Sequence, residues 1–417
     1  MAQLSDDCFA FAGRLLPLAE AQARIAECFS CRAAPERVPL AAALGRVLAG
    51  EITAGLCIPP QANSAVDGYA LHHDDLAPDR PTVLKLAGRA AAGHPLAEPV
   101  PRGTAARVFT GAVMPPGADT VMMQEDCVAT ETEVTVPPGL RRGANRRLAG
   151  EDIAAGERAL PHGRRLTAAD LALLAALGHQ EIAVRRRLRV ALFSTGDEVQ
   201  EPGETLHPGR IYDANRAMLA ALLARLDVDV TDGKILADDA AVVRAALAKA
   251  APAHDLVLTS GGVSSGEEDH VRAAIEAVGT LAFWRVGIKP GRPVALGSVG
   301  DTPLLGLPGN PVAALVTFVT IARPVLDALA GARPVALPRF PVPSAFAWRK
   351  KRDRREFLRV LLDDADGTLR AKNFPKEGAG IITSLTGSDA LAELPEGVTS
   401  IAPGDPLACI PLRLLYG

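Results

Sequence analysis

The chain has 417 residues, 48% of them apolar and 22% charged, which is enough for about two to four globular domains. Its formal net charge of −3 gives no reason to expect a general nucleic-acid binder, whose surface would be basic. No run reaches the roughly 18 apolar residues of a membrane span, and the first residues lack the basic-then-apolar order of a signal peptide. Six scattered cysteines suit a reducing compartment, so we expect a cytoplasmic protein.

Two helical patterns open the chain. In residues 17–29 the apolar side chains fall on one face at helical spacing, and the apolar run of residues 39–48 predicts a second helix despite its glycine. Cys28 and Cys31 form a C-x-x-C pair late in the first pattern. A zinc site would need a second such pair, and a redox motif would need a strand–helix–strand context, so a functional role is not favoured.

Residues 51–150 have a different sequence pattern, in which Pro-Gly and Pro-Pro steps separate short apolar runs. This pattern predicts a β domain inserted after the first helices. Three of its segments look over-specified for plain loops, although each can also be explained as a turn, a strand end or a solvated basic loop. The expected strands are residues 83–86, 106–109, 120–123 and 133–136, and the three segments are residues 59–70, 108–126 and 141–156.

Residues 167–177 predict a helix with well-marked ends. Thr167 and Asp170 have the spacing of a capping box, and Gly178 follows the last apolar residue. Because helical character resumes here after the β insert, we expect the first helices and this one to form one discontinuous unit.

From residue 188 strands and helices alternate, which predicts a doubly wound α/β domain. Ligands of such sheets bind at the carboxyl ends of the strands, so we expect a site at that edge. The expected strands are residues 189–194, 228–230, 255–259, 281–286, 294–296 and 304–307, and the expected helices are residues 216–226, 239–251 and 311–329.

The turn after residues 255–259 reads SGGVSSGEEDH. Its glycines and serines leave backbone N–H groups accessible, and a helical pattern begins at Val271, so the turn suits a phosphate cradle at a helix N-terminus. Glu267, Glu268 and Asp269 beside it suggest Mg²⁺ bridging to that phosphate. The plain alternative is a tight turn with Asp269 as an N-cap.

Other strand ends add charges of both signs. Glu198 and Asp238 follow two of the expected strands, and Lys289 and Arg292 follow another in GIKPGRP, where prolines and glycines fix the backbone. A structural turn needs neither charge type, whereas a site for a phosphorylated, Mg²⁺-dependent ligand needs both. Together the strand ends favour phosphate binding.

After about residue 334 the helical patterns stop. Residues 346–348, 356–362 and 369–371 predict strands, and residues 349–355 are strongly basic. A small all-β domain of about eighty residues fits this pattern.

At this point the motifs carry a resemblance. In chain order they are NSAVDGYA, FTGAVMPPGADTVMMQE, GEDI, STGDEV, IYDANR, TSGGVSSGEEDH, IKPGRP and GLPGNP. This series resembles the MoeA family, the molybdopterin molybdenumtransferases, to which the E-domain of gephyrin is similar. The resemblance covers the chain from about residue 15 to its end. The SGGVS turn alone would not be specific, because the related molybdopterin adenylyltransferases share it.

The resemblance implies an enzyme that takes adenylylated molybdopterin and molybdate, releases AMP and leaves molybdenum on the pterin dithiolene, with Mg²⁺ assisting. It implies an α/β plus β fold in an elongated chain that forms a homodimer, with the lid of one subunit near the α/β domain of the other. A molybdopterin adenylyltransferase and molybdoenzyme acceptors would be further partners. The implied domains are a discontinuous N-terminal dimerisation domain (1–50 and 151–184), a β-rich lid (51–150), a molybdopterin-binding-like α/β domain (185–332) and a C-terminal β-barrel domain (333–417).

The resemblance also implies site residues, motif by motif. The lid would contribute Asp67, Thr110 and Asp152, while Lys289 and Arg292 would contact molybdate or phosphate. The implied catalytic residues are Asp67, Glu198, Asp269, Lys289 and Arg292; the implied metal ligands are Asp152, Glu198, Asp238 and Asp269; and the implied cofactor-binding residues are Thr110, Ser260, Gly261, Gly262, Ser264, Pro308, Pro311 and Arg354.

Two positions depart from the family pattern. Arg292 stands where lysine is more usual, and its planar fork holds an oxyanion in a different geometry. Ala379 stands where the family usually has serine, which removes one hydroxyl donor. These departures leave open a non-catalytic cofactor-binding scaffold. The shared turn leaves open a molybdopterin adenylyltransferase using MgATP, against which the lid and the β tail count.

Overall fold

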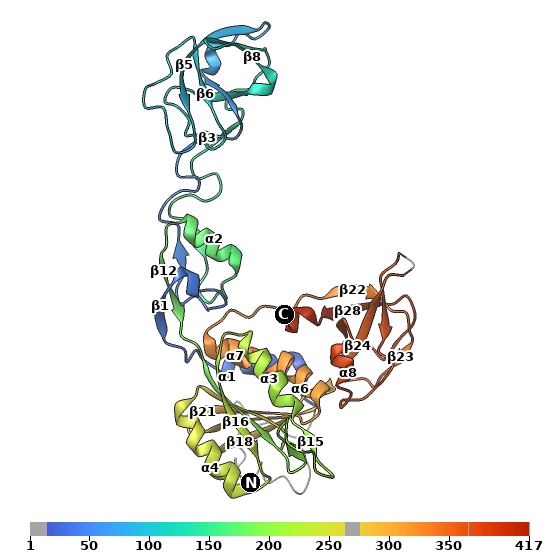
Figure 1. Cartoon of the computed structure of the whole chain (residues 1–417). Helices are drawn as coiled ribbons and strands as arrows, with labels where there is room; N and C mark the ends of the chain where they lie inside the picture. The colour runs from blue at the N-terminus through green and yellow to red at the C-terminus, as the bar shows by residue number, and fades with distance from the viewer. Residues whose placement is uncertain (1–14, 263–275, 366, 417) are drawn as a thin grey trace.

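The structure is a computed structural model that describes residues 15–262, 276–365 and 367–416. Figure 1 shows an elongated molecule with a β-rich lid at one end and an α/β domain at the other. A small unit built from two separate chain segments lies between them, and a C-terminal β-rich domain lies beside the α/β domain.

The N-terminal part combines segments from both sides of the lid. The strand β1 (Pro35–Pro39) pairs antiparallel with β12 (Glu181–Arg185), which returns the chain after the lid. The helix expected at residues 167–177 is confirmed as α2 (Ala168–Ala176), with both hydrogen bonds of the capping box between Thr167 and Asp170. The helix expected at residues 17–29 is confirmed as α1 (Leu18–Cys28), whose buried face joins the core of the α/β domain.

The helix expected at residues 39–48 is wrong. Only a short 3₁₀ turn, η1 (Leu40–Ala42), forms there. Gly45 takes a φ of 77°, which ends helical geometry, while Val47 and Leu48 each form a bridge to a residue on the far side of the lid. Long-range pairing therefore overrides the local helical pattern.

The lid is a six-stranded sheet in the order β7-β4-β6-β5-β9-β8, with a hydrophobic cluster on each face. All four strands expected in the lid are confirmed. The chain enters through β3 (Asn63–Ser64) and leaves through β10 (Arg146–Arg147), and these two strands pair with each other. The sheet strands are β4 (Gly68–Leu71), β5 (Thr82–Ala90), β6 (Thr104–Val108), β7 (Thr120–Met123), β8 (Val128–Ala129) and β9 (Glu133–Val136).

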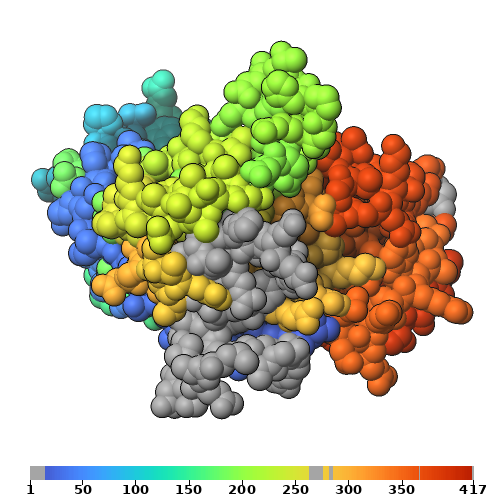
Figure 2. Space-filling view, turned by 90° about the horizontal axis from the view of Figure 1, so that it is seen from below, coloured from blue at the N-terminus to red at the C-terminus, as the bar shows by residue number. Residues whose placement is uncertain are grey.

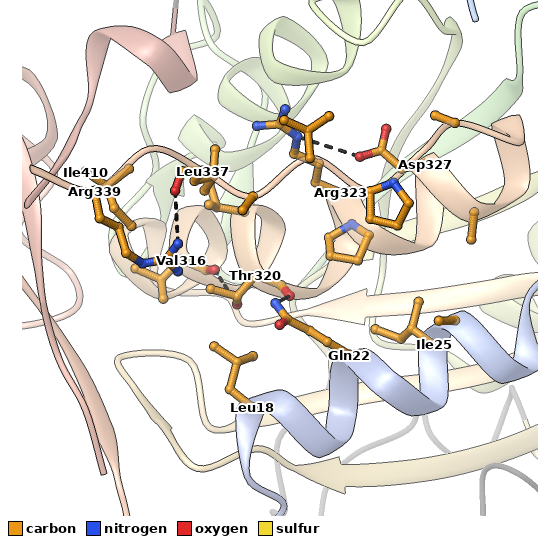
Figure 3. A pocket seen from close by; sticks show the side chains of 18 of the residues that line it. Leu18, Gln22, Ile25, Val316, Thr320, Arg323, Asp327, Leu337, Arg339 and Ile410 are labelled. Carbon is orange, nitrogen blue, oxygen red and sulfur yellow. Dashed lines mark hydrogen bonds and ion pairs between the residues drawn. The ribbon is translucent and has the colours of Figure 1, made fainter. Parts of the chain in front are cut away.

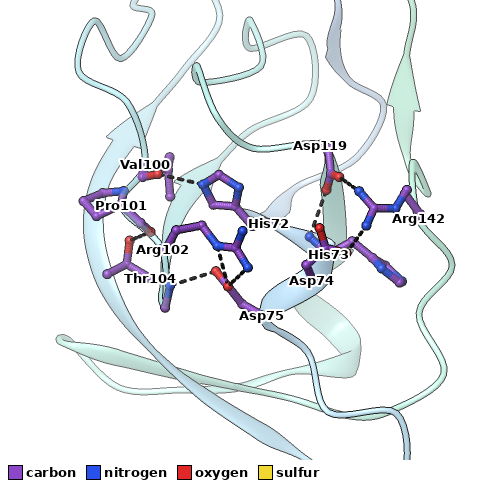
Figure 4. Close-up of polar contacts among 11 residues, drawn as sticks. His72, His73, Asp74, Asp75, Val100, Pro101, Arg102, Thr104, Asp119 and Arg142 are labelled. Carbon is purple, nitrogen blue, oxygen red and sulfur yellow. Dashed lines mark hydrogen bonds and ion pairs between the residues drawn. The ribbon is translucent and has the colours of Figure 1, made fainter.

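Polar contacts fix the loops of the lid (Figure 4). Asp75 accepts a hydrogen bond from Arg102 Nε at 2.7 Å, while Asp119 accepts one from the backbone N–H of His73 at 2.9 Å and pairs with Arg142. Burial alone would raise the pKa of both aspartates, but these donors outweigh burial and lower both pKa values. Because these groups satisfy one another, the cluster holds the lid together and offers little to a ligand.

The α/β domain contains a six-stranded sheet in the order β16-β13-β17-β21-β20-β18. The first four strands run parallel, while β20 runs antiparallel to both of its neighbours, β21 and β18, so the sheet is mixed. The strands are β13 (Arg189–Thr195), β16 (Asp229–Leu236), β17 (Leu256–Ser260), β18 (Gly279–Arg285), β20 (Pro293–Val299) and β21 (Thr302–Leu307).

Helices cover both faces of this sheet, as the doubly wound pattern predicts. The helices α3 (Ala214–Ala224) and α6 (Pro311–Thr317) pack in the core on one face, and α4 (Ala240–Ala250) packs in the core on the other. Side chains of β13 alternate between the two, because successive residues of a strand point to opposite faces. Val190 and Leu192 lie in the first core, and Ala191 and Phe193 lie in the second.

The helix expected at residues 311–329 is confirmed as a continuous run of α6, the π-helical η5 (Phe318–Ala322) and α7 (Arg323–Ala330). By length and average composition this run could cross a bilayer, a test that core helices also pass, and 78% of its most apolar window is buried inside the protein. It packs against α1 and is the central core helix of this domain.

The C-terminal domain is built on a sheet that reaches into the α/β domain. Its strand β24 (Arg355–Asp363) pairs in parallel with β19 (Ile288–Lys289), which belongs to the GIKPGRP segment. Figure 2 shows the two domains side by side, with the C-terminal domain in orange and red. The remaining strands of the sheet are β22 (Phe340–Pro343), β25 (Arg370–Asn373), β26 (Ala390–Leu394) and β28 (Pro406–Pro411).

Candidate active site

The carboxyl ends of β13, β17 and β21 meet in close contact. Asn215, in the first turn of α3, donates to Ser260 Oγ at 2.8 Å and to the carbonyl of Gly309 at 2.8 Å. The backbone N–H of Gly261 donates to the carbonyl of Leu307 at 3.0 Å. A Cβ atom at Gly261 would lie 2.4 Å from the carbonyl oxygen of Thr195, so only glycine fits there. Three expected site residues, Ser260, Gly261 and Gly262, therefore sit where the strand ends converge.

Acidic side chains gather at the neighbouring strand ends. Asp197 Oδ1 accepts a hydrogen bond from the backbone N–H of Asp238 at 3.0 Å, which brings the loops after β13 and β16 together. The carboxylate of Glu198 lies over Gly196, since a Cβ there would approach Glu198 Oε2 to 2.5 Å. Two of the expected acids, Glu198 and Asp238, are thus placed at one edge of the sheet.

Several buried side-chain oxygens lie at the same edge of the sheet. The side-chain oxygens of Ser194, Thr195 and Thr259, together with Oδ1 of Asn215, have no hydrogen-bond partner among the residues that the structure describes. Buried polar atoms are normally paired, so such a cluster is typical of a place that binds a polar ligand. The expected residues Ser264 and Asp269 lie outside the described residues.

An interdomain cleft of about 340 Å³ opens beside these strand ends, between the α/β and C-terminal domains. The α/β domain lines it with Lys289, Pro308 and Asn310, among others. The C-terminal domain lines it with residues that include Trp348, Glu356, Arg359, Phe374 and Ala379. The expected residues Lys289 and Pro308 therefore share one cavity. Pro311, at the start of α6, stands next to it without lining it.

Lys289 is held by two residues that the sequence analysis did not single out. Its ammonium lies 3.1 Å from Glu356 Oε1 and 6.0 Å from the centre of the Trp348 ring. Trp348 Nε1 donates to Glu356 Oε2 at 3.0 Å. Glu356 is only 2% exposed, so a buried carboxylate anchors a lysine whose side chain is still half exposed.

Arg359 and Lys376 also line the cleft, and the sequence analysis missed Arg359 too. Its Nε donates to Ser384 Oγ at 3.1 Å and its Nη2 donates to the carbonyl of Gly378 at 3.1 Å. Burial lowers its pKa, and Glu377 partly offsets this. Because neutral oxygens hold the guanidinium, its charge is not cancelled by a direct carboxylate contact. The backbone carbonyl of Ala379 accepts from the N–H of Val312 at 3.0 Å, which fixes the neighbouring loop on the start of α6.

Unlike Lys289, neither Arg292 nor Arg354 is among the residues that line the cleft. Burial lowers the pKa of Arg292, and repulsion from Arg354 and Arg285 lowers it further, so the three guanidinium groups are close enough to interact. Within the described residues none of the three makes a side-chain ion pair. Arg285, Arg292 and Arg354 therefore form a second cationic patch.

The expected lid residues lie far from these groups within one chain (Figure 1). Asp67 Oδ1 accepts hydrogen bonds from the backbone N–H and the hydroxyl of Thr110, both at 2.8 Å. These bonds lower the pKa of Asp67. Asp152 is exposed in the segment that follows β10, where its backbone N–H donates to the carbonyl of Ile58. A single chain therefore pairs Asp67 with Thr110 but does not bring either to Lys289.

A larger groove of about 430 Å³ lies elsewhere, between α1, the long core helix and the linker to the C-terminal domain (Figure 3). Its walls are mainly apolar, with Leu18, Ile25 and Val316 among the labelled side chains. The side-chain amide of Gln22 donates a hydrogen bond to the carbonyl of Thr320 at 3.0 Å. Arg323 and Arg339 also line this groove, but each is paired with a carboxylate, Asp327 and Glu393 respectively. The interdomain cleft, where neutral oxygens hold Arg359, is therefore the better candidate for an anionic substrate.

Family models match most of the chain. Residues 16–178 match the MoeA N-terminal region (domain I and II), residues 191–328 match the probable molybdopterin binding domain, and residues 341–412 match the MoeA C-terminal region (domain IV). The chain belongs to the MoeA family.

Individual relatives of this MoeA-family chain are similar over nearly their whole length. It is 34% identical to a molybdopterin molybdenumtransferase of Haemophilus influenzae over 406 residues, covering 97% of this chain and 100% of the relative. It is 36% identical to that of a Nostoc species over 391 residues, covering 91% and 89% of the two chains. The crystal structure of a molybdopterin biosynthesis MoeA protein from Pyrococcus horikoshii superposes with a TM-score of 0.81 at 30% identity, covering 95% of this chain and 99% of that one.

Proposed function

We propose that this chain transfers molybdenum from molybdate to adenylylated molybdopterin and releases AMP, as a step in molybdenum cofactor synthesis. The observation that carries the proposal is the interdomain cleft, where Lys289 and Arg359 face one cavity beside the acidic strand ends. Relatives that match the chain over nearly its full length carry the name of this activity.

The charges of the substrates explain why this cleft suits them. Molybdate is a dianion and the adenylylated pterin carries a pyrophosphate, so bringing them together requires fixed cations. Lys289 offers an ammonium at the mouth of the cleft, and Arg359 offers a guanidinium held by neutral partners. These two groups would hold molybdate, while the patch of Arg285, Arg292 and Arg354 would attract the pyrophosphate.

Mg²⁺ fits the described acids in one particular way. No group of three or more potential metal ligands occurs among the described residues. Mg²⁺ is, however, often held by one or two carboxylates together with substrate phosphates, and Glu198, Asp197 and Asp238 meet that need. When bound, the ion would neutralise the pyrophosphate and favour departure of AMP. Asp152 and Asp269 remain candidate ligands on the resemblance alone.

The lid enters the proposal through a second subunit. Asp67 and Thr110 form one polar pair, but they belong to the lid, which lies at the end of the molecule opposite the α/β domain (Figure 1). In a homodimer the lid of one subunit would reach the strand ends of the other and shield the reacting groups from water. We further propose a cytoplasmic enzyme that receives its substrate from a molybdopterin adenylyltransferase and passes its product to molybdoenzymes.

The test is AMP release from adenylylated molybdopterin with and without molybdate. AMP should appear when molybdate and Mg²⁺ are both present, and chelation of Mg²⁺ should stop its release until the ion is restored. A chain that binds the pterin but releases no AMP would be a scaffold. A chain that makes pyrophosphate from ATP would be an adenylyltransferase, and either result would overturn the proposal.

A further inference from the structure

Glu356 is an unusual carboxylate for the wall of an anion-binding cleft. It is 2% exposed and both of its oxygens are engaged, one by Lys289 Nζ at 3.1 Å and one by Trp348 Nε1 at 3.0 Å. Removing a partner from a buried carboxylate is strongly destabilising, so Glu356 requires Lys289 and Trp348 to stay in place. The negative charge therefore stays beside a lysine that the proposed reaction needs.

The backbone fixes this contact across the domain boundary. In the parallel ladder between β19 and β24, Lys289 is the register partner of Glu356. The N–H of Arg355 donates to the carbonyl of Gly287 at 2.7 Å, which ties the two strands together just before the contact. Phe346 packs edge-on against the Trp348 ring, with the ring centres 6.5 Å apart, so the indole is also held in place.

The contact leaves Lys289 able to bind something else. An ammonium has three N–H donors, and within the described residues Glu356 is the only hydrogen-bond acceptor of this one. The Lys289 side chain is 53% exposed, in contrast to the 3% of Glu356. The remaining donors are thus free for an oxyanion in the cleft, while the stem of the lysine is no longer free to swing.

A neighbouring carboxylate shows what a purely structural ion pair looks like here. Glu393 on β26 is 4% exposed and pairs with Arg339 and Arg355, all within the C-terminal domain and its linker. It does not line the cleft. Glu356 matches it in burial but differs in its partner, which is the cleft lysine.

We propose that Glu356 is a positioning residue, which, together with Trp348, holds the ammonium of Lys289 in the orientation that receives molybdate. This inference rests on the proposed function, and it deepens it by assigning a role to residues outside the resemblance motifs. A lysine that is already held in place loses less side-chain entropy when the ligand binds. Conversely, a shift of such a group by about 1 Å lowers the reaction rate.

The decisive comparison is Glu356→Gln against Glu393→Gln. Glu356→Gln keeps the shape but cannot serve both donors, so the KM for molybdate should rise about tenfold while the KM for the adenylylated pterin stays unchanged. Trp348→Phe keeps the ring and loses the N–H, so it should raise the same KM by a smaller factor. Glu393→Gln should lower the thermal unfolding midpoint without changing the KM for molybdate.

Calorimetric titration with molybdate alone separates this inference from the proposed function. The dissociation constant of molybdate should weaken about tenfold in Glu356→Gln and stay unchanged in Glu393→Gln. If wild-type protein binds molybdate but releases no AMP, the proposed function is wrong. The titration would then still test whether Glu356 positions Lys289 for molybdate. If the two glutamine variants unfold earlier but bind molybdate alike, Glu356 is a structural residue and the inference is wrong.

Discussion

Arg359 differs from Arg355, on the same strand, in what holds it. Arg355 is paired with Glu393 and Glu396, whereas the Arg359 side chain hydrogen-bonds to a hydroxyl and a carbonyl among the described residues and lines the cleft. Arg359→Ala should therefore lower molybdate-dependent AMP release about a hundredfold, the size of effect seen when one anion-stabilising donor is lost. The exposed Arg349 on β23 (Trp348–Arg349) supplies the control, because Arg349→Ala should leave the rate unchanged.

The departure at Ala379 can be tested by restoring the usual residue. Ala379 lines the cleft, and its loop is fixed on the start of α6. Ala379→Ser should add a hydroxyl donor towards the bound oxyanion and lower the KM for molybdate by about threefold. Ala347→Ser, at an exposed position of the same domain, should not change it. A raised KM in Ala379→Ser would show that the loop has no room for the hydroxyl.

The sequence predicts the cleft residues unevenly, and the reason is visible in their partners. Lys289 stands out because prolines and glycines surround it, which is a local signal. Glu356 is 67 positions away in the chain, so its contact depends on a strand pairing that no local pattern encodes. Arg354 belongs to the basic stretch of residues 349–355, whereas Arg359 lies beyond its end, and only the path of β24 decides that Arg359 lines the cavity.

At the level of elements, the capping box of α2 has a clear electrostatic consequence. Burial alone would raise the pKa of Asp170, but hydrogen bonds from Arg164 and Thr167 outweigh it and hold the pKa below 3.8. A carboxyl with a lowered pKa stabilises the fold above its unfolded pKa and loses that contribution as pH falls through the folded value.

Asp170→Asn should therefore reduce the free energy of unfolding by about 1 to 2 kcal/mol at neutral pH. The gap to wild type should close as the pH falls through the lowered pKa, because protonation removes the same interaction from the wild-type chain. Thermal unfolding at pH 7 and at successively lower pH values measures how this gap changes. Asp364→Asn, at an exposed position, should match wild type at each pH, and a gap for Asp170→Asn that persists in acid would contradict the assignment.

Elements were predictable where the local signal and the long-range contacts agree. The strands of the α/β sheet and the helices between them follow from apolar runs and turn residues, and α2 follows from its cap. Residues 39–48 show the opposite case, since bridges from Val47 and Leu48 to residues beyond the lid replace a helix with extended chain. Those partners are more than a hundred positions away, so the pattern could not reveal them.

At the scale of the whole molecule, the position of the lid gives a test by complementation. A subunit carrying Asp67→Ala and one carrying Arg359→Ala should each be inactive as homodimers. If the lid of one subunit serves the cleft of the other, half of the randomly mixed dimers hold one intact site, so about a quarter of wild-type activity returns. Mixed dimers that stay inactive would show that each chain completes its own site.

The relative placement of the domains is what the sequence could least predict. The order of the domains follows from the changes in texture along the chain, and the motifs assign residues to each. The meeting of the C-terminal domain with the strand ends depends on the β19–β24 ladder and on the bond from Val312 to Ala379. Both join segments separated by more than sixty residues, so only the folded chain shows that they form one cavity.

The pairing of β3 with β10 at the base of the lid has a practical consequence. Because the two crossings run side by side, everything between Ser64 and Arg146 can be excised or exchanged as one cassette without stretching the remaining chain. Its two hydrophobic clusters travel with it, as do Asp67 and Thr110. Chimeras with a relative's cassette would thus alter the lid side of the proposed active site while leaving the cleft side untouched.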